Sequence, residues 1–465
     1  MNRQVHDKAV TALLLSVGIS SFLSSFMGNA LNIAVPFIAA DYAVAPETIT
    51  WVINGFLITS AAFLLPATAL ANYLGFTVTY RLGALCAALT SFSVPLAPTF
   101  LTLVLFRALQ GMAFALPFCT GMALVFALIP RERRAVALAI CISSVYAGIT
   151  VAPLISGLIT EHLGWEAIFA LGGTGQALGW LLALRLPRLP AHVTSLPAVR
   201  MGVCFAGIAL TLLSLSALNE SALAYGGLFG GLALTALYLI MEGRAHIPVL
   251  PLSPVLSNQP FSLSLFVAFL NFVATFAIGM LLSLHLQLIC HLSASLTGLI
   301  MMTQPVVMLI GSALSPVLTR LLGVHRLTLL GIGMMTSGCA GFIFLTPDSL
   351  WLVIVMQIIV GLGNGIFSPP NANIIMSAVD KSLYALASSL QSLVRTTGMA
   401  LSMALVTLLL NAVITAKAGS ALYLEELSSG IGYIFIISTS VCALATLTNL
   451  YVSATQLKTT PVTKE

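Results

Sequence analysis

Apolar segments follow one another almost without interruption from residue 10 to residue 452, and this succession limits the fold more than any other feature. About 20 apolar residues make a helix long enough to cross a lipid bilayer. A helix is the expected form, because it satisfies its own backbone hydrogen bonds in lipid. In composition, 59% of the residues are hydrophobic and 7% are charged, with a mean hydropathy of +1.07, whereas a soluble domain carries about 25% charged residues. We therefore predict an all-α membrane protein that crosses the bilayer many times.

We expect about fourteen transmembrane helices. They cover residues 10–34, 51–71, 80–98, 101–128, 135–158, 165–186, 201–218, 223–241, 261–289, 297–318, 326–345, 351–376, 385–412 and 430–452.

The charges between these helices predict the orientation. With a cytoplasmic N-terminus, the basic residues of the cytoplasmic segments are Arg3, Lys8, Arg81, Arg131, Arg133, Arg134, Arg185, Arg188, Arg200, Arg244, Arg320, Arg326, Lys381, Lys458 and Lys464. Only Lys417 lies on the opposite side. Cytoplasmic loops carry an excess of Lys and Arg, so we place both termini in the cytoplasm of a multi-pass protein of the plasma membrane, or bacterial inner membrane.

Several classes of function are disfavoured by what the sequence lacks. The net charge of +5 comes from these scattered orientation signals, so there is no basic patch for nucleic acid. The seven cysteines lie mostly inside the spans without C-x-x-C spacing, which is typical of small buried residues. No P-loop and no catalytic or metal-binding constellation can be assembled. We expect no enzyme activity, cofactor or metal.

Two proline-containing connectors divide the chain into three parts. "RLPRLPAHVTSLPAVR" (185–200) and "HIPVLPLSPVLSNQP" (246–260) flank two short Leu- and Gly-rich spans. We predict an N-terminal six-helix bundle over 1–190, an inserted two-helix segment over 191–258 and a C-terminal six-helix bundle over 259–465. The segments "TALANYLGFTVTYRLG" and "PVLTRLLGVHRLTLLG" repeat a pattern of helix end, Leu-Gly and basic residue in the two bundles. Paired six-helix repeats with a midplane site are a known transporter architecture.

Six segments carry a resemblance to a known family. "FRALQGMAFAL" resembles the fourth-helix R-x-x-Q-G pattern of major facilitator superfamily transporters, and "GITVAPLISG" resembles the fifth-helix glycine–proline motif of their antiporters. "ITWVINGFLI", "HIPVLPLSPVLSNQPF", "GLGNGIFSPPNANIIMSAV" and "QSLVRTTGMALSMAL" are similar to segments of the fourteen-helix drug:proton antiporter branch. The resemblance implies the major facilitator fold and exchange of a small organic compound or drug for protons.

The sequence departs from that branch at positions that bear on proton coupling. Met27 stands where the first helix of the branch usually carries an aspartate, five residues before Asn32. The loop after the second helix keeps Gly75 but not the Asp-Arg pattern of the family, and its second-half copy has Arg320 at an aspartate position. Phe56 replaces a tyrosine of the second helix. These changes leave the predicted fold intact and weaken the case for protons.

Arg107 is the charged residue that the apolar pattern singles out. It lies about six residues inside its helix, or ~9 Å from the end at 1.5 Å per residue, and such a residue usually faces the bundle interior. Gln110 and Gly111 share its helix face. An arginine that reaches the outer interface is the alternative. We favour a buried arginine that orients substrate or holds the outer half together, with Asn29 and Asn32 of the first helix as neutral acceptors.

Other polar residues within the spans are candidates for the substrate cavity. Arg395 adds a second positive charge, with Gln391 one turn away, although a role in topology is the alternative. Asn271 and Gln304 are explained equally well by substrate contact and by hydrogen bonds between helices.

A proton site requires a group that titrates, and no carboxylate lies within the predicted spans. The candidates are His285, for which an interfacial position is the alternative, and the outer carboxylates Asp41 and Glu47.

A face of small residues on the fifth helix contains Gly148, Ala152, Pro153 and Gly157. Close helix packing accounts for it, and the resemblance adds a role as the rocking contact of exporters.

We predict a secondary active transporter that exports a small amphipathic compound by alternating access. Its partners would be the small-molecule substrate, the bilayer and, through the resemblance, protons, and we expect a monomer. The alternatives are a facilitator or organic-anion exchanger without protons, and a non-transporting sensor or scaffold on the same fold.

Overall fold

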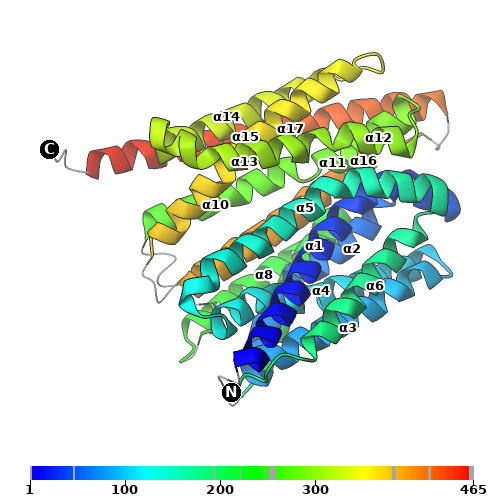
Figure 1. Cartoon of the computed structure of the whole chain (residues 1–465). Helices are drawn as coiled ribbons and strands as arrows, with labels where there is room; N and C mark the ends of the chain where they lie inside the picture. The colour runs from blue at the N-terminus through cyan, green and yellow to red at the C-terminus, as the bar shows by residue number, and fades with distance from the viewer. Residues whose placement is uncertain are drawn as a thin grey trace. The chain divides into compact units, whose positions relative to one another are not determined.

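A computed structural model describes residues 3–45, 48–191, 193, 195–219, 221–246, 248–250, 258–379, 384–416 and 420–459. Long α-helices dominate these residues and no strand occurs among them (Figure 1). The helices of the N-terminal half are α1 (Arg3–Asp41), α2 (Thr50–Leu74), α3 (Phe76–Ser93), α4 (Phe100–Leu128), α5 (Arg131–Leu163), α6 (Glu166–Ala183), α7 (Ala198–Ser216) and α8 (Leu223–Gly243). Those that follow are α10 (Gln259–Thr275), α11 (Ile278–Leu284), α12 (Ala294–Met301), α13 (Thr303–Leu322), α14 (Val324–Gly341), α15 (Leu350–Ser377), α16 (Tyr384–Val413) and α17 (Ala421–Thr459).

The predicted fold class is confirmed, because every predicted span coincides with one helix or with a broken helix. Among the described residues, twelve segments are long and apolar enough to cross a membrane. The other two predicted spans are α3 and α6, each 18 residues long. The first and last helices extend beyond their apolar segments, because a helix does not have to end where its lipid-facing part ends.

Two of the predicted spans are interrupted. The span over 261–289 consists of α10, α11 and a π-helical turn at His285–Ile289. The span over 297–318 breaks between α12 and α13 at Met302. Pro305 lies in the first turn of α13, where its missing amide costs no helix hydrogen bond.

The helices group into two compact units. The first contains residues 1–250, 286–302 and 403–411, and the second contains 251–285, 303–402 and 412–465. The predicted boundaries at residues 190 and 258 divide the chain by sequence position, whereas the two units are divided by contacts between residues. The three-part organisation therefore stays a prediction.

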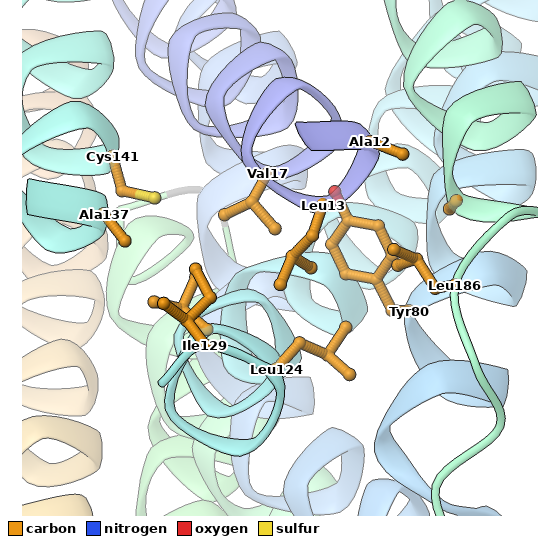
Figure 2. Close-up of a cluster of buried hydrophobic side chains, with 11 residues drawn as sticks. Ala12, Leu13, Val17, Tyr80, Leu124, Ile129, Ala137, Cys141 and Leu186 are labelled. Carbon is orange, nitrogen blue, oxygen red and sulfur yellow. The ribbon is translucent and has the colours of Figure 1, made fainter. Parts of the chain in front are cut away.

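Glycines bring helices of the first unit into close contact. Gly148 of α5 faces the backbone of Phe22 in α1, and Gly207 and Gly231 bring α7 and α8 together. An apolar cluster joins α1, α3, α4, α5 and α6 at one end (Figure 2). Tyr80 is fully buried in this cluster and lies near Leu13, Leu124 and Leu186. This cluster holds the helices that carry the candidate site.

Glycines also bring helices of the second unit into close contact. α14 and α15 meet where Gly331 and Gly363 face each other, and Gly361 faces the carbonyl of Gln304 in α13. Bare backbones pack closely in this way where small residues occupy the interface.

Candidate transport site

Arg107 is buried inside the first unit, with 1% of its surface exposed. Its Nε donates to the carbonyl of Val52 in α2 at 3.1 Å, and its Nη1 donates to Oε1 of Gln110 one turn along α4. The Gln110 Nε2 donates in turn to the Ser91 hydroxyl of α3 at 2.7 Å. The guanidinium is therefore held by neutral acceptors and does not reach the interface.

Two aromatic rings complete the surroundings of the guanidinium. The Arg107 Cζ lies 4.5 Å from the ring centroid of Phe56 and 5.7 Å from that of Phe169 in α6. A cation over a ring face is stabilised by the ring's quadrupole, by about 2 kcal/mol or more when water is excluded. Phe56 therefore presents an aromatic face to the arginine.

Gly111 explains why α2 supplies the acceptor. It faces the carbonyl of Phe56 and the hydroxyl of Thr59, and a side chain there would push the helices apart. Thr59 donates to the carbonyl of Ala108 at 2.7 Å, which joins the same two helices. The pair Gln110–Gly111 thus does two things: the glutamine binds the arginine and the glycine lets the Val52 carbonyl reach it.

The asparagines expected to bind Arg107 lie elsewhere. Asn29 donates from Nδ2 to the carbonyl of Ser25 in its own helix at 2.8 Å, and Asn32 is buried on the same helix. The hydrogen bonds of Arg107 go to α2 and α4, so the expected partners on α1 are replaced by a backbone carbonyl and by Gln110. Backbone acceptors carry no signal in the sequence, so a sequence pattern points to side-chain acceptors instead.

The remaining cavity candidates belong to the second unit. Gln391 and Arg395 are half-buried one turn apart on α16, and Gln304 is half-buried at the start of α13. Asn271 is buried in α10, and its Oδ1 has no hydrogen-bond partner.

The proton-site candidates differ in exposure. His285 is 1% exposed, begins the π-helical turn, and has a buried Nε2 without a hydrogen-bond partner. Asp41 is exposed and accepts from the indole Nε1 of Trp165 at 2.6 Å. Beside it, burial and then the charges of Glu166 and Asp41 raise the pKa of Tyr42. Glu47 lies outside the described residues.

The small-residue face of α5 packs against two helices of its unit. Gly148 faces α1, whereas Gly157 faces the carbonyl of Ala294 in α12. Gly298 of α12 faces the carbonyl of Pro153 in return, and Ala152 is fully buried. The Glu161 carboxylate accepts from the amide of Ser295 at 2.8 Å. α5 and α12 therefore approach each other through backbone on both sides.

Sequence analysis missed a buried carboxylate. Glu242 near the end of α8 has a fully buried side chain, forms an ion pair with Arg200 at 3.0 Å and accepts from the amide of Leu250 at 2.8 Å. The signal was available, since α7 begins and α8 ends with opposite charges, but Glu242 falls just outside the predicted span.

Comparison with protein families decides what kind of protein carries these features. The model of the Major Facilitator Superfamily matches residues 17–403 and, in a second match, 266–462. The chain belongs to the Major Facilitator Superfamily. It is therefore a multi-pass integral membrane transporter of small molecules and not an enzyme.

Several curated relatives of this major facilitator are similar over most of their length. The cephamycin export protein CmcT of Amycolatopsis lactamdurans is 28% identical over 463 residues, covering 95% of this chain and 92% of the relative. The riboflavin transporter RibZ of Clostridioides difficile is 26% identical over 377 residues, or 80% and 82% of the two chains. The multidrug resistance protein Stp of Mycobacterium tuberculosis is 26% identical over 416 residues, or 87% and 76%.

Solved structures agree on the major facilitator fold. The POT family transporter PepTSo has a TM-score of 0.70 at 13% identity, covering 97% of this chain and 99% of that one. A bacterial homologue of the human lysosomal transporter Spinster has a TM-score of 0.69 at 16% identity and covers both chains completely. At these identities the likeness concerns the fold alone.

Proposed function

We propose that this major facilitator exports a small amphipathic organic compound by alternating access, in exchange for protons. The observation that carries the proposal is the buried Arg107, whose hydrogen bonds go to the Val52 carbonyl and to Gln110. The naming of relatives such as CmcT and Stp as export and resistance proteins supports the direction. The protein would lie in the plasma membrane, the inner membrane of a bacterium, with both termini in the cytoplasm.

The charge of Arg107 is expensive to bury, so its retention requires a benefit. An arginine at the centre of a helix in the bilayer costs about 2.5–3.5 kcal/mol on insertion scales. Its described partners are neutral, so they disperse the positive charge without cancelling it. The electrostatic potential around α4 therefore favours an anionic or oxygen-rich substrate over a cation. The hydrogen bonds of Arg107 and Gln110 that join α2, α3 and α4 also keep that half of the transporter rigid.

As part of this proposal, His285 carries the protons. A histidine titrates near neutral pH, and π-helical turns occur frequently at functional sites. The unpartnered, buried Nε2 of His285 supports this assignment. Asp41 and Glu47 would then serve the outer mouth.

Purified protein in liposomes with an imposed pH gradient and an internal pH dye tests the proposal. The panel consists of lipophilic cations, neutral drugs and organic anions. We expect a substrate from the anionic or neutral group to dissipate the gradient, Arg107→Ala to abolish both flux and dissipation, and Arg107→Lys to retain part of them. Arg320→Ala, an exposed residue at the end of α13, is the matched control and should leave flux unchanged.

His285→Gln separates coupling from transport. It should stop the dissipation of the pH gradient while a radiolabelled substrate still crosses down its own gradient. If His285→Gln remained coupled, the proton site would lie elsewhere. If no member of the panel crossed in an Arg107-dependent way, export itself would be refuted.

A facilitator or anion exchanger without protons is the second candidate. Met27, at the position of the branch's first-helix aspartate, favours it. It predicts Arg107-dependent flux with an undisturbed pH gradient in the wild type. A scaffold predicts that Arg107→Ala lowers stability while no substrate ever crosses.

A further inference from the structure

A cavity of about 310 Å³ lies in the second unit, between the start of α10, the start of α14 and the end of α15. The polar side chains that line this α10–α14–α15 cavity are Asn258, His325, Asn373 and Ser377. A water molecule takes about 30 Å³, whereas pockets for small ligands begin at about 300 Å³. The cavity therefore has the size of a ligand site. With the predicted orientation, all three helix ends lie on the cytoplasmic side.

Asn258 closes one side of the cavity. Its Oδ1 accepts from the amide of Phe261 at 3.1 Å, and its Nδ2 donates to the carbonyl of Ala378 at 2.5 Å. One side chain thus caps the start of α10 and the end of α15 at once. The Ile374 carbonyl accepts from the amide of Ala378 and from the hydroxyl of Ser377. These two carbonyls of the α15 end are therefore already bonded, which weakens the attraction of this wall for a cation.

The start of α14 presents hydrogen-bond donors to the cavity. Gly323 precedes the helix and supplies no side-chain cap. The amide of Leu327 donates to the carbonyl of Gly323, so the amides of residues 324–326 have no acceptor within the helix. Free amides and the positive end of a helix dipole together attract phosphate groups. The start of α14 therefore favours an anion.

A side chain next to these amides points to a ligand independently of the helix end. The Nδ1 of His325 is buried and has no hydrogen-bond partner among the described residues. An imidazole nitrogen can donate or accept, and a buried polar atom without a partner costs free energy. A ligand that bonds to this Nδ1 removes that cost.

The charges around the cavity have one sign. Within ten positions of its lining residues, the charged residues that the structure describes are Arg320 and Arg326, both exposed. No acidic residue occurs in that part of the described chain. The field at the cavity therefore attracts anions from the cytoplasmic side.

We propose that the α10–α14–α15 cavity binds a phosphate group, which accepts from the first-turn amides of α14 and from Nδ1–H of His325. Asn373 and Ser377 of α15 line the same space, so the phosphate joins the ends of α14 and α15. Two sources carry this chemistry, the headgroup of an anionic phospholipid in the cytoplasmic leaflet and a soluble phosphate compound. Basic pockets between transmembrane helices on this side are typical sites for anionic headgroups. The proposal depends on neither the exported substrate nor protons.

Hydrogen–deuterium exchange of the full-length protein in a neutral detergent tests the site. The probes are inorganic phosphate, glycerol 3-phosphate and the short-chain lipid dihexanoyl phosphatidylglycerol, each compared with sodium chloride at equal ionic strength. A bound phosphate occupies the free amides, so exchange in a peptide covering 324–327 should slow about tenfold at a probe concentration of about ten times the dissociation constant. Slowing by the lipid alone would identify a headgroup site, and slowing by the soluble probes alone a metabolite site. No slowing by any probe would overturn the proposal.

The start of α3 is the internal control. It also follows a glycine turn, but a Cβ on Gly75 would meet the carbonyl of Leu189, so this turn is covered. Exchange in a peptide covering 76–79 should not respond to the probes. Equal slowing in both peptides would show that phosphate binds helix ends in general, and the cavity would then have no special role.

Two variants test the lining. His325→Leu removes the imidazole and should weaken the affinity for the protecting probe at least about tenfold, the value of one charge-assisted hydrogen bond. His325→Asn places an amide close to the position of Nδ1 and should restore most of the affinity. His246→Leu, an exposed histidine on the predicted cytoplasmic side of the first unit, is the matched control and should leave the affinity unchanged. Unchanged affinity in His325→Leu would refute the site.

Ser377→Leu keeps the proposal testable if His325→Leu does not fold. It fills the cavity from α15 without altering α14, so it should abolish the slowing of exchange in 324–327. Slowing that survived Ser377→Leu would place the phosphate outside the cavity and overturn the proposal.

Discussion

The turns before α3 and α14 have the same backbone conformation but differ in the segments that pack over them. Gly75 has φ 90° and ψ 143°, and Gly323 has φ 83° and ψ 154°. Each follows a leucine and is the residue before a helix, in the two segments that repeat the Leu-Gly pattern. A non-glycine residue rarely adopts this conformation, so the repeated glycine has the same local cause in each unit.

In the first unit the turn is covered by the chain beyond α6. A Cβ on Gly75 would meet the carbonyl of Leu189, and Thr77 donates to the carbonyl of Pro187 at 2.8 Å. Arg81 binds the end of α6, with bonds to the carbonyls of Ala183 at 2.9 Å and Leu186 at 2.6 Å. Basic residues near a helix C-terminus satisfy its free carbonyls.

In the second unit no described residue packs over the corresponding turn. A Cβ on Gly323 would meet no atom within 4 Å. The α10–α14–α15 cavity, of about 310 Å³, adjoins the turn through Val324 and His325. Leu329 stands six residues after Gly323, where Arg81 follows Gly75, so the arginine clamp has no copy. The comparison teaches that a repeated motif determines the turn, whereas its burial depends on the segment that packs over it.

Gly75→Ala should break the first turn most severely. The added Cβ meets the carbonyl of Leu189 at 2.6 Å, in addition to backbone strain of about 1–3 kcal/mol. We expect loss of well over 3 kcal/mol, seen as a large drop in the thermal unfolding midpoint in detergent. Gly323→Ala incurs the strain alone, and an equal drop in both variants would contradict the comparison.

Arg81→Leu should have the next largest effect. It removes three hydrogen bonds from a partly exposed charged group to the carbonyls of Ala183, Leu184 and Leu186, so we expect destabilisation of about 2 kcal/mol, where a bond to a charged group contributes about 1.5–3 kcal/mol. The same unfolding measurement applies. Arg326→Leu, an exposed arginine near the second turn, is the control and should stay within about 0.5 kcal/mol.

Tyr80→Phe tests the polar tip of the buried cluster in Figure 2. The phenol donates to the Ser20 hydroxyl at 3.0 Å and lies 3.0 Å from that of Ser16. Removing it leaves the ring packed and the serine hydroxyls with fewer partners, so we expect a loss of about 1 kcal/mol. A loss as large as that of Arg81→Leu would show that the ring had moved as well.

Thr328→Val, at the position that corresponds to Tyr80, should have the smallest effect. Its hydroxyl donates to the His325 carbonyl of its own helix at 2.9 Å and lies 3.4 Å from the Asn449 Oδ1 of α17. Such a long bond contributes about 0.5 kcal/mol at most. If Thr328→Val lowered the free energy of unfolding by more than Tyr80→Phe does, the stronger polar contact would lie in the second unit. The comparison would then be reversed.

Arg107 and Glu242 show how far a linear pattern can locate a site. The isolation of Arg107 in an apolar run predicted a buried arginine, and Gln110 was named as its neighbour three residues on. Its acceptor, the Val52 carbonyl, was missed because every residue has a carbonyl and only the close approach at Gly111 selects this one. Glu242 was missed because its burial depends on the return of residues 249 and 250 onto α8.

The sequence by itself determined the membrane class, the fourteen helical spans, the repeated Leu-Gly turns and the resemblance to the family, because hydrophobic length and local backbone preference are properties of short segments. Only the tertiary structure decided which carbonyl holds Arg107, that Asn258 joins the start of α10 to the end of α15, and that one Leu-Gly turn is covered while its copy borders a cavity. These outcomes depend on how residues tens to hundreds of positions apart pack in three dimensions. A hydrogen bond forms only where that packing brings the donor and the acceptor within a few ångströms of each other.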